Sequence, residues 1–275
     1  MIKINYMKTA IILINMFFVF YSFCTAQENN NKSDLDSVVK NCKNKNFTQA
    51  LMDVNYLIKK DSTFAEAYYY RGCINKNIKN HREAINDFNM AIKLGFNKAD
   101  VYLERQKQTN FFAKNISNKD SIYKIELADI NKAIELDSLL VEAYIDRAFL
   151  FRDLNIKYNS NRATRDSVNQ IALNDINKAL TIDSSYAQAY WAKGVLIPIL
   201  YINKLPDDSI YSMAINNLTK AIFYDSENAM YYRDRSNFKS QNGDKLGACE
   251  DLKKAVELGG ESIAISKYDY DNLCK

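Results

Sequence analysis

Three segments of this chain are near copies of one another, and they constrain its fold more than any other feature. Each is nineteen residues long, begins with Asp-Ser and ends with Asp-Ser. They read DSIYKIELADINKAIELDS (120–138), DSVNQIALNDINKALTIDS (166–184) and DSIYSMAINNLTKAIFYDS (208–226), and they start 46 and then 42 residues apart. A segment that recurs at nearly regular intervals predicts an array of similar structural units.

The second half of each copy has a pattern that also occurs at residues 84–91 and 248–255. In the pattern an acid stands three positions after the first residue, usually Ala, an apolar residue follows the acid, and a second Ala stands seven positions after the first. Residues at i, i+4 and i+7 line one face of a helix. We name this predicted element helix B. Eleven residues later comes a tyrosine, which is followed after three residues by a basic residue, in a second predicted helix named A. The tyrosines are Tyr68, Tyr102, Tyr144, Tyr190 and Tyr232.

The alternation of helices A and B resembles the tetratricopeptide repeat family. The similarity is clearest in residues 65–95, where Tyr68, Gly72, Ala84, Phe88 and Ala91 match the family pattern at the family spacing. The resemblance implies an all-α fold, a right-handed superhelical solenoid of about six helix-turn-helix repeats over residues 34–260. Only seven Gly and two Pro in 275 residues agree with helices joined by short turns.

The repeats differ in length at one place only. The first small position of helix B falls at Ala50, Ala84, Glu126, Ala172, Ala214 and Ala248, at intervals of 34, 42, 46, 42 and 34. Because the family period is 34 residues and the step from B to the next A is constant, the extra residues lie between A and B of repeats 3–5. We expect a helix B longer by about one turn there, capped by its Asp-Ser pair, with the extensions aligned along one edge.

Two departures concern packing and turns. In repeat 3, Glu126 replaces the usual Ala of helix B and Gln106 replaces the small residue of helix A. The proline that follows helix B in the family is absent, and Asp-Ser pairs stand there instead. Their side chains are able to stabilise a turn by hydrogen bonding.

The two ends of the chain are predicted to lie outside the solenoid. Residues 1–26 have the pattern of a secretory signal peptide, with Lys3 and Lys8 before a short apolar run and a cleavage site after Ala26. Met7 is an alternative start, and the weaker alternatives are a retained membrane anchor or a lipid attached to Cys24. Residues 27–33 are a predicted linker, and residues 261–275 are a predicted capping segment.

Composition narrows the function classes. The formal net charge is only +4, so nothing favours binding to nucleic acid or to a membrane surface. The one histidine, His81, is expected in a solvent-facing loop, and no metal-ligand, phosphate-loop or nucleophile pattern appears. We therefore expect no metal, no cofactor, no catalytic residue and no enzymatic activity. An abundance of Asn, Lys and Ile is typical of an AT-rich bacterial genome.

The basic residue of helix A recurs with an acid of helix B. The pairs are Arg71 with Asp87, Arg105 with Asp129, Arg147 with Asp175 and Arg235 with Asp251, while repeat 5 has Lys193 and Asn217. A row of anion-binding arginines is one interpretation. Structural Arg–Asp pairs are the favoured one, because each arginine has an acid at hand to neutralise it.

Four cysteines follow the predicted signal peptide: Cys42, Cys73, Cys249 and Cys274. An exported protein is able to oxidise them into two bridges, Cys42–Cys73 and Cys249–Cys274, one at each end of the solenoid. Buried free thiols are the favoured interpretation, since pairing cannot be read from sequence.

The resemblance also implies a concave surface lined by helices A. In repeat 2 it assigns Glu66, Tyr69, Cys73, Lys76 and Asn77 to that surface, and in repeat 3 it begins with Asp100. The candidate partner-binding residues, chosen for an apolar centre with polar ends, are Tyr69, Leu103, Phe111, Ile145, Phe149, Arg152, Trp191 and Val195. An equally weighted alternative is that the inserts cover this wall and make it core.

These features predict an exported, periplasmic or cell-surface scaffold that binds a peptide or protein segment in its groove. One alternative is a cell-envelope assembly component that docks through the insertion edge. Another is a sugar- or substrate-binding module with a closed pocket.

Overall fold

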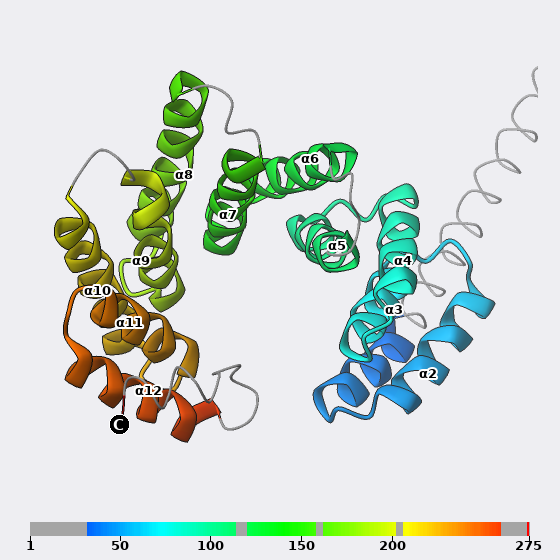
Figure 1. Cartoon of the computed structure of the whole chain (residues 1–275). Coiled ribbons are helices and arrows are strands. Elements are labelled where there is room, and N and C mark those ends of the chain that lie inside the picture. Colours follow the sequence, from blue (N-terminus) through cyan, green and yellow to red (C-terminus); the bar gives the residue numbers. More distant parts are fainter. Residues whose placement is uncertain (1–31, 114–119, 158–161, 202–205, 260–273, 275) are drawn as a thin grey trace, which may run out of the picture. The chain divides into compact units, whose positions relative to one another are not determined.

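The predicted all-α fold is confirmed. The computed structural model describes residues 32–113, 120–157, 162–201, 206–259 and 274, and all regular secondary structure in these ranges is helical (Figure 1). The predicted signal peptide, most of the predicted linker, and all of the predicted capping segment except Cys274 lie outside the described residues. Within the described ranges, none of the helices combines the length and apolar character that crossing a membrane requires.

The chain divides into two compact units, residues 1–118 and 119–275, which are described separately. The first holds a helix over 32–43, α2 (Phe47–Lys60), α3 (Ala65–Asn77), α4 (His81–Lys93) and α5 (Ala99–Phe112). The second holds α6 (Asp120–Leu136), α7 (Val141–Lys157), α8 (Arg162–Ile182), α9 (Ala187–Tyr201), α10 (Asp207–Tyr224), α11 (Ala229–Gln241) and α12 (Lys245–Gly259). From α2 to α5 and from α6 to α12, each helix packs on the next, as a solenoid of helical hairpins requires.

Small residues let helices A and B of one repeat approach closely, as the sequence pattern predicts. A β-carbon on Gly72 of α3 would lie 2.6 Å from the ring of Phe88 in α4. In repeat 5 a β-carbon on Gly194 would lie 2.8 Å from Leu218. Close contact of this kind fills the core at the density typical of protein interiors.

The extra residues of repeats 3–5 are built mainly into longer helices. Helix B has 13 residues in α4 but 17 in α6, 21 in α8 and 18 in α10. The expected gain of about one turn holds for α6 and α10, whereas α8 gains about two turns. Helix A lengthens as well, to 17 residues in α7, which the sequence analysis did not predict.

The predicted Asp-Ser caps are wrong for the B helices of repeats 4 and 5, whereas α6 of repeat 3 begins at the predicted Asp120. Helix α8 begins at Arg162, so Asp166 lies inside it, because the inserted residues continue the helix backwards. Helix α10 has Pro206 at its N-cap, and Asp207 and Asp208 occupy the first turn. There the carboxylates still favour the helix, since negative charge is stabilised near the positive end of the helix dipole.

The Asp-Ser pair after helix B forms the predicted turn, with the aspartate as the hydrogen-bonding side chain. Asp61, Asp137, Asp183 and Asp225 each accept a hydrogen bond from the backbone N–H two residues later. The serine contributes its carbonyl oxygen, which accepts from the tyrosine hydroxyl of the next helix A. These pairs are Tyr68 to Ser62, Tyr144 to Ser138 and Tyr190 to Ser184. This shared turn explains why the three copies end alike.

The boundary between the two units falls inside repeat 3, between α5 and α6. This is the repeat in which Gln106 and Glu126 replace the small residues of the A and B helices. Both side chains are buried, with exposed fractions of 5% and 1%. Both are larger than the residues that the repeat pattern has at these positions.

Candidate functional site

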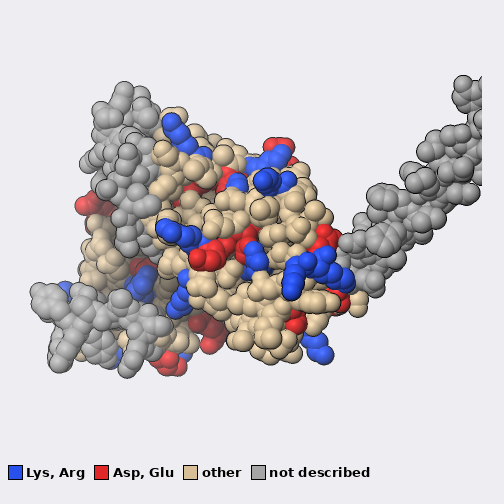
Figure 2. All heavy atoms as spheres, turned by 90° about the vertical axis from the view of Figure 1, so that its right-hand side faces the viewer, with Lys and Arg blue, Asp and Glu red and all other residues tan. Residues whose placement is uncertain are grey.

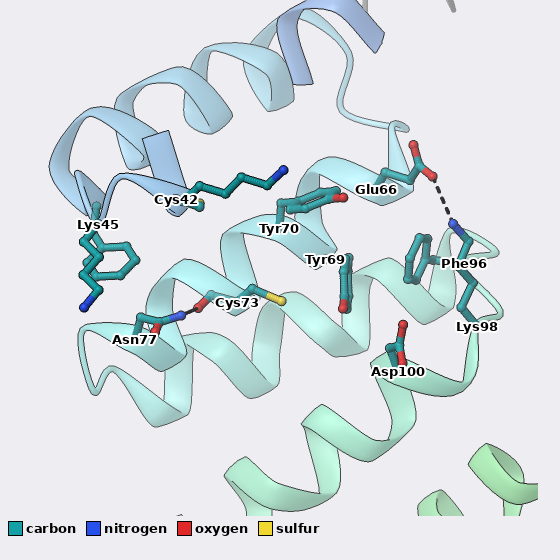
Figure 3. A pocket seen from close by; sticks show the side chains of 12 residues that line it. Cys42, Lys45, Glu66, Tyr69, Tyr70, Cys73, Asn77, Phe96, Lys98 and Asp100 are labelled. Atoms are coloured by element: carbon teal, nitrogen blue, oxygen red, sulfur yellow. Dashed lines mark hydrogen bonds and ion pairs between the residues drawn. The ribbon is translucent and has the colours of Figure 1, made fainter. Parts of the chain in front are cut away.

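A hollow of about 460 Å³ lies in the first unit, and residues of three successive repeats line it (Figure 3). The helix over 32–43 contributes Cys42, and α3 contributes Tyr69 and Cys73. Phe96 comes from the segment before α5, and Asp100 comes from the first turn of α5. The lining includes five residues that the sequence analysis assigned to the concave surface: Glu66, Tyr69, Cys73, Asn77 and Asp100.

Aromatic rings form the apolar part of the hollow. The ring of Tyr69 stacks on Phe96, with 4.7 Å between centroids, and meets Tyr70 edge-on at 5.4 Å. Phe96 reaches this position because Gly95 adopts a positive φ of 94°, a conformation that ends α4 and turns the chain back. Burial raises the pKa of Tyr69, so its hydroxyl stays neutral, and it shares a hydrogen bond with Cys73.

Charged groups of both signs surround the aromatic rings. Lys98 Nζ lies 3.5 Å from Glu66 Oε1 and 5.0 Å from the centre of the Phe96 ring. In Figure 3, Lys45 lies at the opposite end of the hollow from Glu66, Lys98 and Asp100. Figure 2 shows that lysine, arginine and acidic side chains are interspersed on the face it displays, in keeping with the small net charge. An apolar floor with a few polar groups around it suits a ligand that presents an apolar side chain between hydrogen-bonding groups.

Two free thiols complete the lining. Cys42 and Cys73 are both half-buried and unbonded. Burial raises the pKa of Cys73 to about 11, and it also raises the pKa of Cys42. The favoured expectation of free thiols thus holds for this pair, whereas it is wrong for Cys249 and Cys274, which form a disulfide in the second unit.

Several lining residues escaped the sequence analysis. Cys42, Lys45 and Phe47 belong to repeat 1, whose helix A lacks the tyrosine that marks the others, so its register was not assigned. Phe96 and Lys98 lie in the link from repeat 2 to repeat 3. Gly95-Phe96 stands where most other repeats have an Asp-Ser turn. This difference is the sequence signal that could have shown that the segment between α4 and α5 folds differently.

Two of the eight candidate partner-binding residues belong to the core. Leu103 is 3% exposed and Ile145 is fully buried, so neither side chain is available to a partner. Ile145 packs with Tyr144, Ala179 and Ala189 of the second unit. The tetratricopeptide pattern placed both on the concave wall, but an apolar side chain is more stable where neighbours cover it.

The other candidates retain exposed surface. Phe111 is 48% exposed, and its ring lies 4.0 Å from that of His81. His81 itself begins α4, is half-buried and is hydrogen-bonded through Nδ1 to Gln108 Oε1 at 2.7 Å. The expectation of a solvent-facing loop histidine is therefore wrong, because Gln108 and Phe111 of α5 cover it.

In the second unit, Phe149, Arg152, Trp191 and Val195 are partly buried. The rings of Phe149 and Trp191 are 5.3 Å apart, and the Arg152 guanidinium lies 4.8 Å from the centre of the Phe149 ring. Trp191 Nε1 donates a hydrogen bond of 2.7 Å to Asp234. These contacts fix the side chains of Phe149, Arg152 and Trp191 relative to one another, and part of their surface remains exposed.

The favoured interpretation of the arginines is confirmed in three repeats. Arg71, Arg147 and Arg235 pair with Asp87, Asp175 and Asp251 at 2.6, 2.7 and 2.6 Å. Each arginine also donates to a residue sixteen positions earlier, on the preceding helix B: Asn55, Asn131 and Thr219. The guanidinium thus ties together consecutive repeats. The fourth predicted pair, Arg105 with Asp129, has one residue in each unit and stays a prediction.

Repeat 5 shows what replaces the ion pair. Lys193 donates to Asn177 at 3.1 Å, and Asn217 donates to the carbonyl of Met213 in its own helix. Burial and the nearby Lys220 lower the pKa of Lys193. The link to the preceding repeat is kept, while the link within the repeat is lost.

Both units thus stack helix-turn-helix hairpins with the small-residue crossings of tetratricopeptide repeats, and solved structures show the same fold. The chain is similar to PilW, a widely conserved type IV pilus biogenesis factor (12% identity, 89% of this chain and 98% of that one, TM-score 0.65). It is also similar to TTC0263, a tetratricopeptide repeat protein of Thermus thermophilus (12% identity, 76% and 98%, TM-score 0.61). A third is YrrB, a tetratricopeptide repeat protein with an unusual peptide-binding site (18% identity, 72% and 88%, TM-score 0.52).

The chain therefore has the tetratricopeptide repeat fold. No family model matches its sequence, and no curated protein does.

Proposed function

We propose that this protein is an exported, non-catalytic scaffold that binds a peptide or protein segment on the concave surface of its A helices. The observation that carries the proposal is the hollow in the first unit, where five residues assigned to that surface converge. Its aromatic floor and charged surroundings offer both apolar contact and hydrogen bonding. The partly exposed Phe149, Arg152, Trp191 and Val195 form a second contact region in the other unit.

Two further observations support the proposal. The Cys249–Cys274 disulfide suits an oxidising compartment, and the segment before residue 27 has the pattern of a signal peptide. YrrB, which has the same fold, carries a peptide-binding site.

A display screen tests the proposal directly. Residues 27–275 are exposed to a library of random peptides, and dissociation constants are measured for the enriched sequences. The test variants are Asp100→Lys and Asn77→Asp, both exposed side chains of the hollow. The matched control is Asn86→Lys, a position of α4 that does not line the hollow. Circular dichroism confirms that each variant is folded.

The expected result is weaker peptide binding in the hollow variants and unchanged binding in Asn86→Lys. Equal binding by all three variants removes the hollow from the site. If Arg152→Glu then abolishes binding, the contact region of the second unit carries it instead. If neither unit responds, docking through the longer B helices replaces groove binding as the explanation.

A further inference from the structure

The two thiols of the hollow lie on neighbouring A helices. Cys42 is in the last turn of the helix over 32–43, and Cys73 is in the middle of α3. Both line the same cavity, in which Figure 3 shows them with Tyr69 and Tyr70. They are also close enough for a charge on Cys42 to act on Cys73, and charge on either thiol acts on Tyr70.

We propose that Cys42 and Cys73 form one thiol–disulfide exchange site, which takes a low-molecular-weight disulfide as its substrate and ends as a Cys42–Cys73 bond across the hollow. The remaining two cysteines of the described residues are already joined, Cys249 to Cys274 in the second unit. The first unit therefore keeps both of its described thiols for this reaction.

The first described helix packs on the same core as α3. A disulfide requires Cα atoms within about 7 Å, so the helix over 32–43 and α3 lie that near each other in the bonded form. Leu35 and Val38 hold that helix in a core cluster with Ala67 and Ile74 of α3. The same cluster includes Val54 and Leu57 of α2, and Ser37 and Asn41 donate hydrogen bonds to Asp53 of α2, so the helix over 32–43 and α2 shift together as the bond forms. Because both thiols line the hollow, the bond takes up part of its space.

The different enclosure of the thiols sets the order of steps. Cys73 is the more enclosed of the two, and its higher pKa leaves fewer thiolates at neutral pH. Cys42 therefore reacts first. Its thiolate attacks one sulfur of the incoming disulfide, a Cys42–S bond forms, the S–S bond of the reagent breaks, and the departing thiolate takes up the proton that Cys42 released.

Cys73 then resolves the mixed disulfide. Its thiolate attacks Sγ of Cys42, the Cys42–Cys73 bond forms, and the second reagent sulfur leaves and takes up the proton released by Cys73. The two cysteine thiols lose two electrons, and one disulfide is reduced to two thiols. The consequence for binding rests on the proposed function: once bonded, the hollow no longer accepts its peptide.

The experiment uses the folded chain 27–275 with the Cys249–Cys274 bond intact and no partner present. Oxidised glutathione is added, the reaction is quenched in acid, free thiols are alkylated, and the digested peptides are assigned by mass spectrometry. The test variants are Cys73→Ser and Cys42→Ser, and Cys73→Ala and Cys42→Ala repeat the test without a new hydroxyl group. Circular dichroism checks the folding of each.

We expect the native protein to lose two hydrogens and give a Cys42–Cys73 linked peptide. Cys73→Ser stops with one glutathione on Cys42, and Cys42→Ser stays unmodified over the same period. The proposal is overturned if native protein keeps a stable glutathione adduct, if Cys73 reacts equally fast without Cys42, or if the bond forms only in urea.

A separate measurement compares the peptide affinity of the reduced and bonded forms, which tests whether the Cys42–Cys73 bond blocks peptide binding. Loss of binding in the bonded form supports it, and equal binding overturns it while the exchange site stands. If neither form binds any peptide, the proposed function fails, and the mass measurement still decides the exchange chemistry.

Discussion

The ring of Phe88 lies against the Cα of Gly72, so close that a β-carbon there would be 2.6 Å from Cε1 of the ring. Phe88 is fully buried and unable to swing aside freely. The contact therefore fixes how near α3 and α4 approach each other. It also fixes the wall of the hollow, because Tyr69 and Cys73 stand on α3 beside Gly72.

Gly72→Ala is expected to lower the free energy of unfolding by about 1–2 kcal/mol. Overpacking of a filled core costs about 1–3 kcal/mol, while replacing a helical glycine by alanine returns part of it. Urea unfolding followed by circular dichroism measures the change. Asn86→Ala, on α4 but outside its buried face, serves as control and should not destabilise. An unchanged midpoint for Gly72→Ala would show that the contact relaxes without cost.

Arg147→Ala is expected to destabilise the second unit by about 3 kcal/mol. Its guanidinium donates twice to Asp175, whose side chain is 6% exposed, and removal of one partner leaves a buried charge uncompensated. The double variant Arg147→Lys/Asp175→Asn copies Lys193 and Asn217 of repeat 5 and should lose less. Fluorescence of the single tryptophan, Trp191, follows this unit during urea unfolding. A double variant as unstable as Arg147→Ala would contradict the explanation.

Cys249→Ser is expected to lower the stability of the second unit by about 3 kcal/mol, because the bond joins residues 25 positions apart and closes a loop in the unfolded chain. Cys274→Ser should have the same effect. A reducing agent should bring the native protein to the level of the variants and leave the variants unchanged. A further loss in the reduced variants would mean that another bond contributes.

In Cys42→Ser, alkylation of Cys73 by iodoacetamide should be slow at pH 8 and rise about tenfold per pH unit until about pH 11. The pKa of Cys73 is about 11, so about one thiol in a thousand is ionised at pH 8. Burial is the main cause, and Glu104 and Lys76 act on the thiol with opposite signs. The alkylated fraction is read by mass spectrometry. A rate that levels off near pH 9, as in an unfolded peptide, would show that the thiol is not enclosed.

The sequence predicted the repeating hairpin and the Arg–Asp pairs because both depend on fixed spacings along the chain. Arg71 and Asp87 are sixteen residues apart, as are Arg235 and Asp251 in the other repeat of standard length, and neighbouring helices bring each pair together. The first residue of each helix was harder to predict. Asp166 is acceptable both as a helix cap and inside a helix, and the residues before it determine whether the helix begins earlier.

The candidate site was predicted only in part. Family positions included Tyr69, Cys73 and Asp100, which line the hollow, but Leu103 and Ile145 are core because neighbouring side chains cover them. Burial of that kind depends on the lengths and angles of several helices, which no single repeat pattern specifies. Phe96 joins the hollow through the backbone turn at Gly95, a three-dimensional effect of one φ angle.

The Asp-Ser turn has a consequence for how such a chain changes over evolutionary time. Its aspartate closes the turn, and its serine carbonyl holds the tyrosine of the following helix, so an added residue there would break two bonds at once. The part of a repeat between the cores of its helices A and B has instead accepted 8 to 12 extra residues in repeats 3–5, since the intervals there are 42, 46 and 42 against a family period of about 34. Most of these residues lengthen the helices. Insertions of foreign sequence between helices A and B should therefore be tolerated, which makes that edge the natural place to attach a label or a second domain.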